Sequence, residues 1–356
     1  PVEAEICEGE KYILPKVAVM QMDDGNFMTL PVKWKEEPDF SILTPGKYSI
    51  EAYAPDERFP DIAPSATIVI TSEKYVVDEI EIKPVVEPFA PGDVKIDGGI
   101  FAENRDRMYQ YLLNTDDDSM LYNFRQAAGI DTKGATPMTG WDAPECLLKG
   151  HTTGHYLSAL ALALKNGNYE NELGSKINYM IDELARCQDT MEKSGEFNYG
   201  FLSGYSEEQF DLLEEYVIYP KIWAPWYTLH KIMAGLLDCY EFAGNEKAYE
   251  ICKKLGTWVY NRLNACSEEK RQKMWSMYIA GEFGGMNEVM ARLYGLAKEP
   301  EYMTAAKFFD NEKLFYPMSM NIDTLGGIHA NQHIPQVIGA FEMFRQGEGQ
   351  HYYHIA

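Results

Sequence analysis

The histidines of this chain are unevenly placed in a way that points to chemistry. All seven follow position 150 of the 356 residues, and five of them fall in three short clusters. His151 and His155 form the first cluster, His230 stands in the second, and His329 and His333 form the third. Each cluster directly precedes a stretch with the apolar pattern of a helix. Imidazole rings at the starts of successive helices indicate one polar site built from several loops.

Two kinds of chemistry suit these rings. His151 and His155 are four residues apart, as are His329 and His333, and on a helix this spacing puts both rings on one face. Such a pair suits a metal ion, but neither pair includes the glutamate of an HExxH motif. Each ring can equally bind a sugar hydroxyl or cap a helix.

Aromatic residues and one carboxylate accompany the histidines. Tyr227 precedes His230 by three positions, and Trp141 and Asp142 form a compact turn after a glycine. A sugar packs its C–H face on an aromatic ring, and such rings also fill protein cores. For His230, ligand contact and structural packing both remain open at this stage.

Further carboxylates allow two interpretations each. Glu282 and Glu288 flank a Gly-Gly pair, and two carboxylates beside one cleft can act as acid and base in glycoside hydrolysis. The alternative, preferred for Glu288, is a negative charge placed at a helix N-terminus. The acidic run at 116–118 predicts a helix start, with calcium binding as the alternative.

Composition excludes several classes of function. The chain has 32 Lys and Arg against 55 Asp and Glu, a formal charge of -23, which argues against nucleic acid or an anionic membrane as a partner. It lacks the run of roughly 18 apolar residues that spans a membrane. The six cysteines show no CxxC spacing, so the sequence predicts neither a disulfide framework nor a zinc cluster.

The elements that must position these residues change along the chain, which indicates a multidomain protein. Residues 1–82 contain short runs rich in β-branched and aromatic residues between Asp-Gly and Pro-Gly turns, which predicts a small antiparallel all-β sandwich. Its Val-x-Trp and Pro-Gly-x-Tyr-x-Ile segments resemble bacterial Ig-like modules. Residues 83–103 read as a linker, and helical periodicity extends over 104–356.

The helical part repeats one pattern four times. Apolar helices are expected at 156–164, 232–242, 289–296 and 334–344, each followed by a short turn and a second helix. Four helical hairpins predict an all-α toroid of the (α/α)6 type. If the four apolar helices run in the same direction, their N-termini and the histidine clusters share one rim.

Six segments together resemble the bacterial β-L-arabinofuranosidases of glycoside hydrolase families 127 and 146. They cover 118–125, 140–142, 150–159, 227–236, 281–288 and 329–335. The resemblance implies an (α/α)6 barrel with β-domains, in which His230 and His329 contact an arabinofuranose. Phe283 stands where family members commonly carry histidine, which leaves the identity of the sugar open. The predicted sugar-binding wall consists of Trp141, Asp142, His151, His155, Tyr227, His230, Glu282, Asn287, His329 and His333.

The resemblance also implies catalytic groups that this chain does not match. The family uses a zinc-bound cysteine as nucleophile and a glutamate as acid/base, located after the segment that contains His329. The chain has no Cys-Cys pair, and its cysteines do not match those positions. We therefore expect the front part of a toroid, incomplete at its C-terminus, with the zinc ligands outside this chain.

The motifs and the family resemblance together predict two alternative functions. The first is a secreted or cell-surface bacterial glycoside hydrolase that acts on β-L-arabinofuranosides by a retaining mechanism. Its partners would be an arabinose-containing oligo- or polysaccharide and the missing C-terminal part of the same protein. The alternative is a non-catalytic carbohydrate-binding or scaffold protein.

Overall fold

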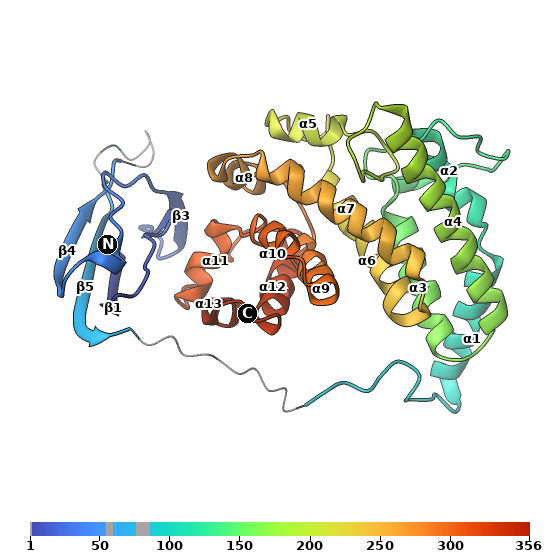
Figure 1. The fold of residues 1–356 in the computed structure, drawn as a ribbon, viewed down its shortest axis with the longest axis horizontal. Coiled ribbons are helices and arrows are strands. Elements are labelled where there is room, and N and C mark those ends of the chain that lie inside the picture. The colour runs from blue at the N-terminus through green and yellow to red at the C-terminus, as the bar shows by residue number, and fades with distance from the viewer. Residues whose placement is uncertain (1, 55–59, 61, 76–85) are drawn as a thin grey trace. The chain divides into compact units, whose positions relative to one another are not determined.

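The computed structural model describes residues 2–54, 60, 62–75 and 86–356, so residues 83–85 of the predicted linker lie outside it. Within these residues a small β-rich region is followed by a mostly helical region (Figure 1). The chain divides into two compact units. The first contains Pro1–Lys83, Asp310–His329 and Gly347–Ala356, and the second contains Pro84–Phe309 and Ala330–Gln346. The predicted boundaries after residues 82 and 103 stay predictions.

The first unit contains two small sheets. One has the strand order β1 (Val2–Glu8), β5 (Ser65–Lys74), β4 (Gly46–Glu51), and the other is the antiparallel hairpin of β2 (Val17–Gln21) and β3 (Phe27–Pro31). The sequence predicted β2 to β5 but missed β1. It was also wrong in expecting antiparallel pairing throughout, because β1 pairs with β5 in parallel. The alternation of apolar residues shows which face of a strand is buried but not the direction of its neighbour.

A continuous apolar core fills this unit. Trp34 is buried in it, and its indole N–H donates to the carbonyl of Pro15 at 2.8 Å. The short helix η1 (Phe40–Ile42) contributes the buried ring of Phe40. Other members of the core are Ile6, Ile50, Ile68 and Ile70.

Two helices that lie late in the sequence, α11 (Glu312–Ser319) and α13 (Gln350–Ile355), also belong to the first unit. The hydroxyl of Tyr352 in α13 donates to Asp310 at 2.6 Å, beside the start of α11. The sequence predicted a return helix for the fourth hairpin in the region where α13 lies. The structure instead groups it with the first unit, because its contacts are with α11.

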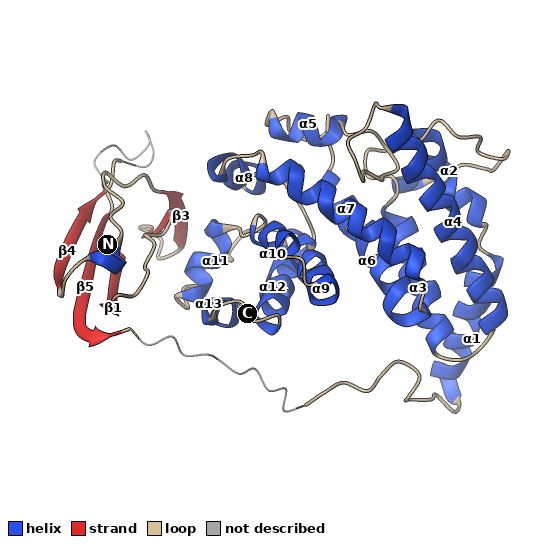
Figure 2. Ribbon diagram, in the orientation of Figure 1, coloured by secondary structure: helices blue, strands red, loops and turns tan. Residues whose placement is uncertain are grey.

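The second unit consists of helices in two rows (Figure 2). The inner row contains α3 (His151–Lys165), α6 (Pro225–Ala243), α9 (Met286–Ala297) and α12 (Ala330–Arg345). The outer row contains α4 (Glu170–Ser194), α7 (Glu246–Asn264) and α10 (Pro300–Lys307). Helices α1 (Gly99–Asn114), α2 (Asp117–Ala127), α5 (Glu208–Glu214) and α8 (Glu268–Trp275), together with η2 (Gly140–Asp142), complete the described elements of this unit. The first three predicted hairpins are therefore present.

The inner helices all run in the same direction, which the sequence analysis had set only as a condition. His230 of α6 contacts Gly285, immediately before α9. Further along both helices, Asp238 of α6 contacts Arg292 of α9, so α6 and α9 run in the same direction. The same order holds between α9 and α12, where a Cβ on Gly339 would meet Asn287 and one on Gly295 would meet Gln346. Between α3 and α6, Thr228 donates to the carbonyl of Leu148 just before α3, and Cys239 donates to that of Leu157. The N-termini of the inner helices consequently share one rim of the unit, which we call the N-terminal rim.

Glycine permits the closest of these helix contacts. A Cβ atom on Gly154 of α3 would lie 2.1 Å from the carbonyl oxygen of Lys231, and one on Gly235 of α6 would lie 2.4 Å from the carbonyl oxygen of Gly154. Backbone therefore packs directly against backbone between α3 and α6. This contact fixes the distance between the two histidine-bearing helix starts.

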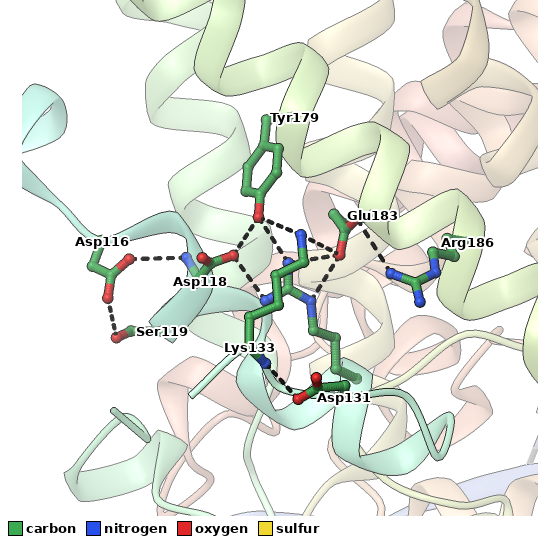
Figure 3. A network of polar contacts seen from close by, with 9 residues as sticks. Asp116, Asp118, Ser119, Asp131, Lys133, Tyr179, Glu183 and Arg186 are labelled. Atoms are coloured by element: carbon green, nitrogen blue, oxygen red, sulfur yellow. Dashed lines mark hydrogen bonds and ion pairs between the residues drawn. The ribbon is translucent and has the colours of Figure 1, made fainter. Parts of the chain in front are cut away.

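A polar network joins α2 to α4 (Figure 3). Asp116 caps α2 by accepting from the backbone N–H of Asp118 at 3.1 Å, which confirms the predicted helix start. The fully buried Arg125 pairs with Asp118 at 2.8 Å and with Glu183 of α4 at 2.6 Å. Tyr179 adds a further bond to the Arg125 guanidinium at 3.0 Å. Charges in this network are paired with one another, so it holds two helices together.

No helix among the described residues is long and apolar enough to cross a membrane.

Candidate functional site

The site begins where a buried carboxylate joins η2 to the start of α3. Oδ1 of Asp142 accepts the backbone N–H of Gly150 at 2.7 Å, and Oδ2 accepts the hydroxyl of Thr152. Gly150 has a φ of 102°, in the left-handed region that glycine adopts most easily. Asp142 thus holds the η2 turn against the N-terminus of α3, where a helix favours negative charge.

The proton on His151 is placed by its neighbours. Its Nδ1 lies 2.9 Å from the carbonyl oxygen of Leu148, which can only accept, so Nδ1 carries a proton. Asp142 Oδ2 lies 3.3 Å from the same nitrogen. In the neutral ring, Nε2 is then the acceptor, and it lies 3.4 Å from the hydroxyl of Thr152. This leaves His151 able to accept a hydrogen bond from a ligand hydroxyl.

Aromatic rings extend from His151 in two directions. The ring centroid of Tyr227 on α6 lies 6.2 Å away, and that of His155 also lies 6.2 Å away. On the other side Trp141 lies 6.3 Å from His151 and 6.0 Å from Trp223. Trp141 is open to solvent, with 63% of its surface exposed. The loop 140–142 and the starts of α3 and α6 therefore build one aromatic surface.

Lys231, which was not predicted as a site residue, lies over one ring of this surface, that of Tyr227. The ammonium group of Lys231 stands 4.6 Å from the centre of the Tyr227 ring. Burial lowers the pKa of Lys231, and the carboxylates of Glu282 and Glu288 oppose that effect. Burial, together with Lys231 and His151, also lowers the pKa of His155. Lys231 therefore supplies a partly desolvated hydrogen-bond donor at the N-terminal rim.

Glu282 belongs to the same electrostatic environment. Burial and the charge of Glu282 together raise the pKa of the Tyr227 phenol, so this hydroxyl keeps its proton. Glu282 also acts on Lys231. Donors and a carboxylate acceptor thus converge beside the aromatic surface, which is the arrangement that binds a polyhydroxylated molecule.

His230 is held from two sides. The backbone N–H of Gly285 donates to its Nδ1 at 3.2 Å, and its Nε2 lies 3.9 Å from Glu288. Burial lowers the pKa of His230 to about 4, against the opposing effect of Glu288, so the ring is neutral at pH 7. The loop before α9 is therefore fixed to α6 by an imidazole.

Glu288 contacts His230 and also takes part in an ion-pair network. Its Oε1 lies 3.5 Å from Arg292, which also pairs with Asp238 at 2.8 Å and with Glu241. Burial alone would raise the pKa of Glu288, but His230 and Arg292 hold it below its ordinary value. Residues of α6, α9 and α12 around this network line an open groove of about 440 Å³. Glu288 is consequently an ionised partner of two helices and not a proton donor at neutral pH.

The structure brings most of the predicted wall together. Seven of its members lie around the aromatic surface or the loop before α9: Trp141, Asp142, His151, His155, Tyr227, His230 and Glu282. Asn287 is fully buried between α9 and α12, with Gly339 making room for its amide. His333 lies in the first turns of α12, whereas His329 is exposed and belongs to the first unit. A sugar contact stays a prediction for all ten residues of the predicted wall.

Phe283 lies in the core and not at the site. Its fully buried ring is 5.0 Å from that of Trp275 and 5.2 Å from that of Phe309. The side chain at this position therefore supports the loop that carries Glu282.

The described residues offer no set of three or more His, Cys, Asp or Glu side chains that could hold a metal ion. All six cysteines are free thiols. Burial raises the pKa of Cys187 and of Cys252 to about 12, so both keep their protons. The residues present do not fit a zinc–thiolate centre.

Sequence reasoning missed Lys231, Trp223 and Tyr219. Lys231 had a usable signal, since it is a charged residue at the start of an otherwise apolar helix. Trp223 and Tyr219 lie in a loop without periodicity, and their rings meet at 5.4 Å only after folding. Pattern analysis does not place loop residues of this kind.

Comparison with known proteins shows which families the two regions of the chain match. Residues 93–356, more than half of the chain, match the model of the β-L-arabinofuranosidase GH127 catalytic domain. Residues 1–56 match the bacterial Ig-like domain, group 4. Both matches confirm the resemblances inferred from the motifs. No curated protein matches the chain.

Among solved structures, the chain is similar to the crystal structure of a GH127 β-L-arabinofuranosidase from Geobacillus stearothermophilus T6. The two are 14% identical, with a TM-score of 0.42. The similarity covers 71% of this chain and 41% of the Geobacillus protein. The chain thus spans less than half the length of that relative.

Proposed function

This chain belongs to the family of the β-L-arabinofuranosidase GH127 catalytic domain, and from that premise we propose that it binds β-L-arabinofuranosides of plant-type glycans. The N-terminal rim of the second unit is the proposed binding wall. The observation that carries the proposal is the contact of Lys231 with the Tyr227 ring beside His151, which Asp142 and the Leu148 carbonyl orient. The charge of Glu282, in the loop before α9, acts on both Tyr227 and Lys231.

Each side chain has a distinct task in this proposal. His151 Nε2 accepts a sugar hydroxyl, because its Nδ1 proton is already donated to a backbone carbonyl. Lys231 and the protonated phenol of Tyr227 donate, and Glu282 accepts. The exposed face of Trp141 packs against the C–H face of the sugar ring. Asp142 is a positioning residue, since its oxygens are used within the chain.

We propose that the whole protein is a secreted or cell-surface bacterial glycoside hydrolase with a retaining, two-step mechanism. Its nucleophile and its acid/base would come from another part of the same protein. The zinc expected for the full-length enzyme has no ligand set among the residues described above. The chemistry derived for this chain is therefore limited to binding and orienting the sugar.

The state of Glu288 fits the alternative, a non-catalytic carbohydrate-binding or scaffold protein, as well as it fits the first proposal. Glu288 is engaged by His230 and Arg292, and its pKa lies below the ordinary value. A glycosidase acid needs a carboxyl group that holds its proton near neutral pH. Glu288 does not meet that requirement.

Calorimetry and an activity assay on the same samples test the proposal. We expect the 356-residue chain to bind arabinofuranosyl oligosaccharides without hydrolysing an aryl β-L-arabinofuranoside. Lys231→Met should weaken binding by about tenfold or more, the loss of one charge-assisted hydrogen bond. Lys254→Met is the matched control, since Lys254 pairs with Asp189 and Glu192, away from the rim.

Three results would change the assignment. Absence of binding by the wild-type chain would overturn it. Turnover by the 356-residue chain itself would assign catalysis to its own carboxylates, first Glu282. Binding without cleavage by the complete gene product would establish the alternative.

A further inference from the structure

We propose that the N-terminal rim holds a second sugar subsite, formed by the rings of Trp141, Trp223 and Tyr219, which we call the aromatic strip. It would stack the neutral sugar unit adjacent to the one held at His151. This inference rests on the proposed function and extends it from one sugar ring to two.

The rings of the strip pack on one another while remaining open to solvent. Trp141 and Trp223 meet at 6.0 Å with an interplanar angle of 65°, and Trp223 and Tyr219 meet at 5.4 Å and 77°. Trp141 is 63% exposed and Tyr219 is 42% exposed, whereas Trp223 between them is partly buried. Single exposed aromatics are common, but adjoining exposed rings leave apolar area in water that a ligand can cover. Edge-to-face packing keeps ring faces available for stacking.

Both tryptophans are held in place by their backbones. Trp141 lies in η2, which Asp142 joins to α3 and which Asn123 supports through a 2.7 Å bond to the Asp142 carbonyl. Trp223 precedes Ala224, a buried residue with a φ of 41° that directly precedes Pro225. A left-handed alanine before proline is strained, so surrounding contacts must fix this turn. Rings that are already ordered lose little entropy when a ligand binds.

The strip continues directly from the binding wall. Trp141 is the shared member, because its ring lies 6.3 Å from that of His151 on one side and 6.0 Å from that of Trp223 on the other. A ligand at His151 that extends toward Trp223 would therefore place its next unit on the strip. The strip's own side chains are uncharged aromatics, which match the C–H face of a neutral sugar.

The test compares ligands of one and two rings on the full chain by calorimetry. The one-ring probe is methyl β-L-arabinofuranoside, and the two-ring probe is a β-L-arabinofuranosyl disaccharide. We expect the wild type to bind the disaccharide about tenfold more tightly, the contribution of one stacked ring. Trp223→Ala and Tyr219→Ala should each remove most of this gain and leave the affinity for the one-ring probe within about twofold.

Two controls separate stacking from a general disturbance. Trp223→Phe keeps a ring and should retain most of the gain. Tyr199→Ala removes an exposed ring near Lys254 on α7 and should retain all of it. Tyr219→Ala decides the question if Trp223→Ala does not fold, as judged by thermal melting.

The possible failures are distinguishable. Equal affinity for both probes, or a gain that survives in Trp223→Ala and Tyr219→Ala, overturns the second subsite and leaves the proposed function intact. The second subsite is also overturned if Tyr199→Ala loses as much of the disaccharide affinity gain as the variants of the strip do. Binding of neither probe overturns the proposed function and the subsite with it.

Discussion

The backbone N–H of Gly285 donates a hydrogen bond to Nδ1 of His230 at 3.2 Å, and this contact decides where the imidazole carries its proton. A nitrogen that accepts a hydrogen bond has no proton of its own, so the neutral ring is protonated at Nε2, which faces Glu288. Two neighbouring glycines of the loop before α9 allow this close approach to the ring. A Cβ on Gly284 would lie 2.7 Å from Nδ1, and one on Gly285 would lie 3.0 Å from Nε2.

We predict that His230 stays neutral well below pH 6. Burial lowers its pKa to about 4 from the ordinary 6.5, so between these values the unfolded chain binds a proton that the folded chain does not. The contribution of His230 to stability is therefore complete above pH 6.5 and is lost as pH falls toward 4. Nitrogen NMR of the ring should show the Nε2–H tautomer, with a midpoint near pH 4.

A matching measurement uses the free energy of unfolding. His230→Gln keeps an acceptor for Gly285 but does not titrate, so stability should fall less steeply between pH 6.5 and 4 than in the wild type. A ring midpoint near 6.5, or the Nδ1–H tautomer, would contradict the geometry described for this loop.

We predict that Asp142 matters chiefly for the structure of the rim. Asp142→Ala leaves the N–H of Gly150 and the hydroxyl of Thr152 without their acceptor, which should cost about 1–3 kcal/mol in urea denaturation. Asp142→Asn keeps one acceptor oxygen and should cost less. Asp97→Ala, at an exposed position before α1, is the control and should change stability by less than about 0.5 kcal/mol. The idea fails if the two alanine variants are equally stable.

Replacing two helical glycines by alanine should change the free energy of unfolding in opposite directions. A Cβ on Gly154 would meet the Lys231 carbonyl oxygen at 2.1 Å, so Gly154→Ala must separate α3 from α6 and should cost at least about 2 kcal/mol. A Cβ on Gly174 of α4 meets nothing within 4 Å, so Gly174→Ala should stabilise by roughly 0.5–1 kcal/mol. Thermal and chemical denaturation of both variants measure the contrast. Similar effects of the two changes would refute the close contact.

The buried guanidinium of Arg125 should be far more important than a neighbouring exposed one (Figure 3). Arg125→Ala leaves Asp118 and Glu183 without their shared partner and should cost about 3–5 kcal/mol. Lysine cannot reproduce the forked geometry, so Arg125→Lys should recover little. Arg186 pairs with Glu183 at 3.7 Å from an exposed position, and Arg186→Ala should cost less than about 1 kcal/mol. Equal losses at the two arginines would show that burial does not govern this network.

Local patterns in the sequence were sufficient for the inner helices of the second unit. The apolar periodicity at 156–164, 232–242, 289–296 and 334–344 predicted the four inner helices, because burial of a helix face imposes a regular spacing on its residues. Asp116 was recognised as a helix start because capping is a local interaction. Strand direction was not predictable in the same way, and the parallel pairing of β1 with β5 was missed.

The sequence by itself determined the order of the inner helices and the family resemblance, since each depends on residue types at short spacing. The common direction of these helices, and with it their shared rim, came from contacts between helices. Only the tertiary structure decided which atoms meet. It turned Asp142 into a support for α3, placed Lys231 over Tyr227, and buried Asn287 between two helices. It also joined Trp141 to Trp223, some eighty residues later in the chain. Such contacts depend on how helices pack and how loops close, and no spacing along the chain encodes them.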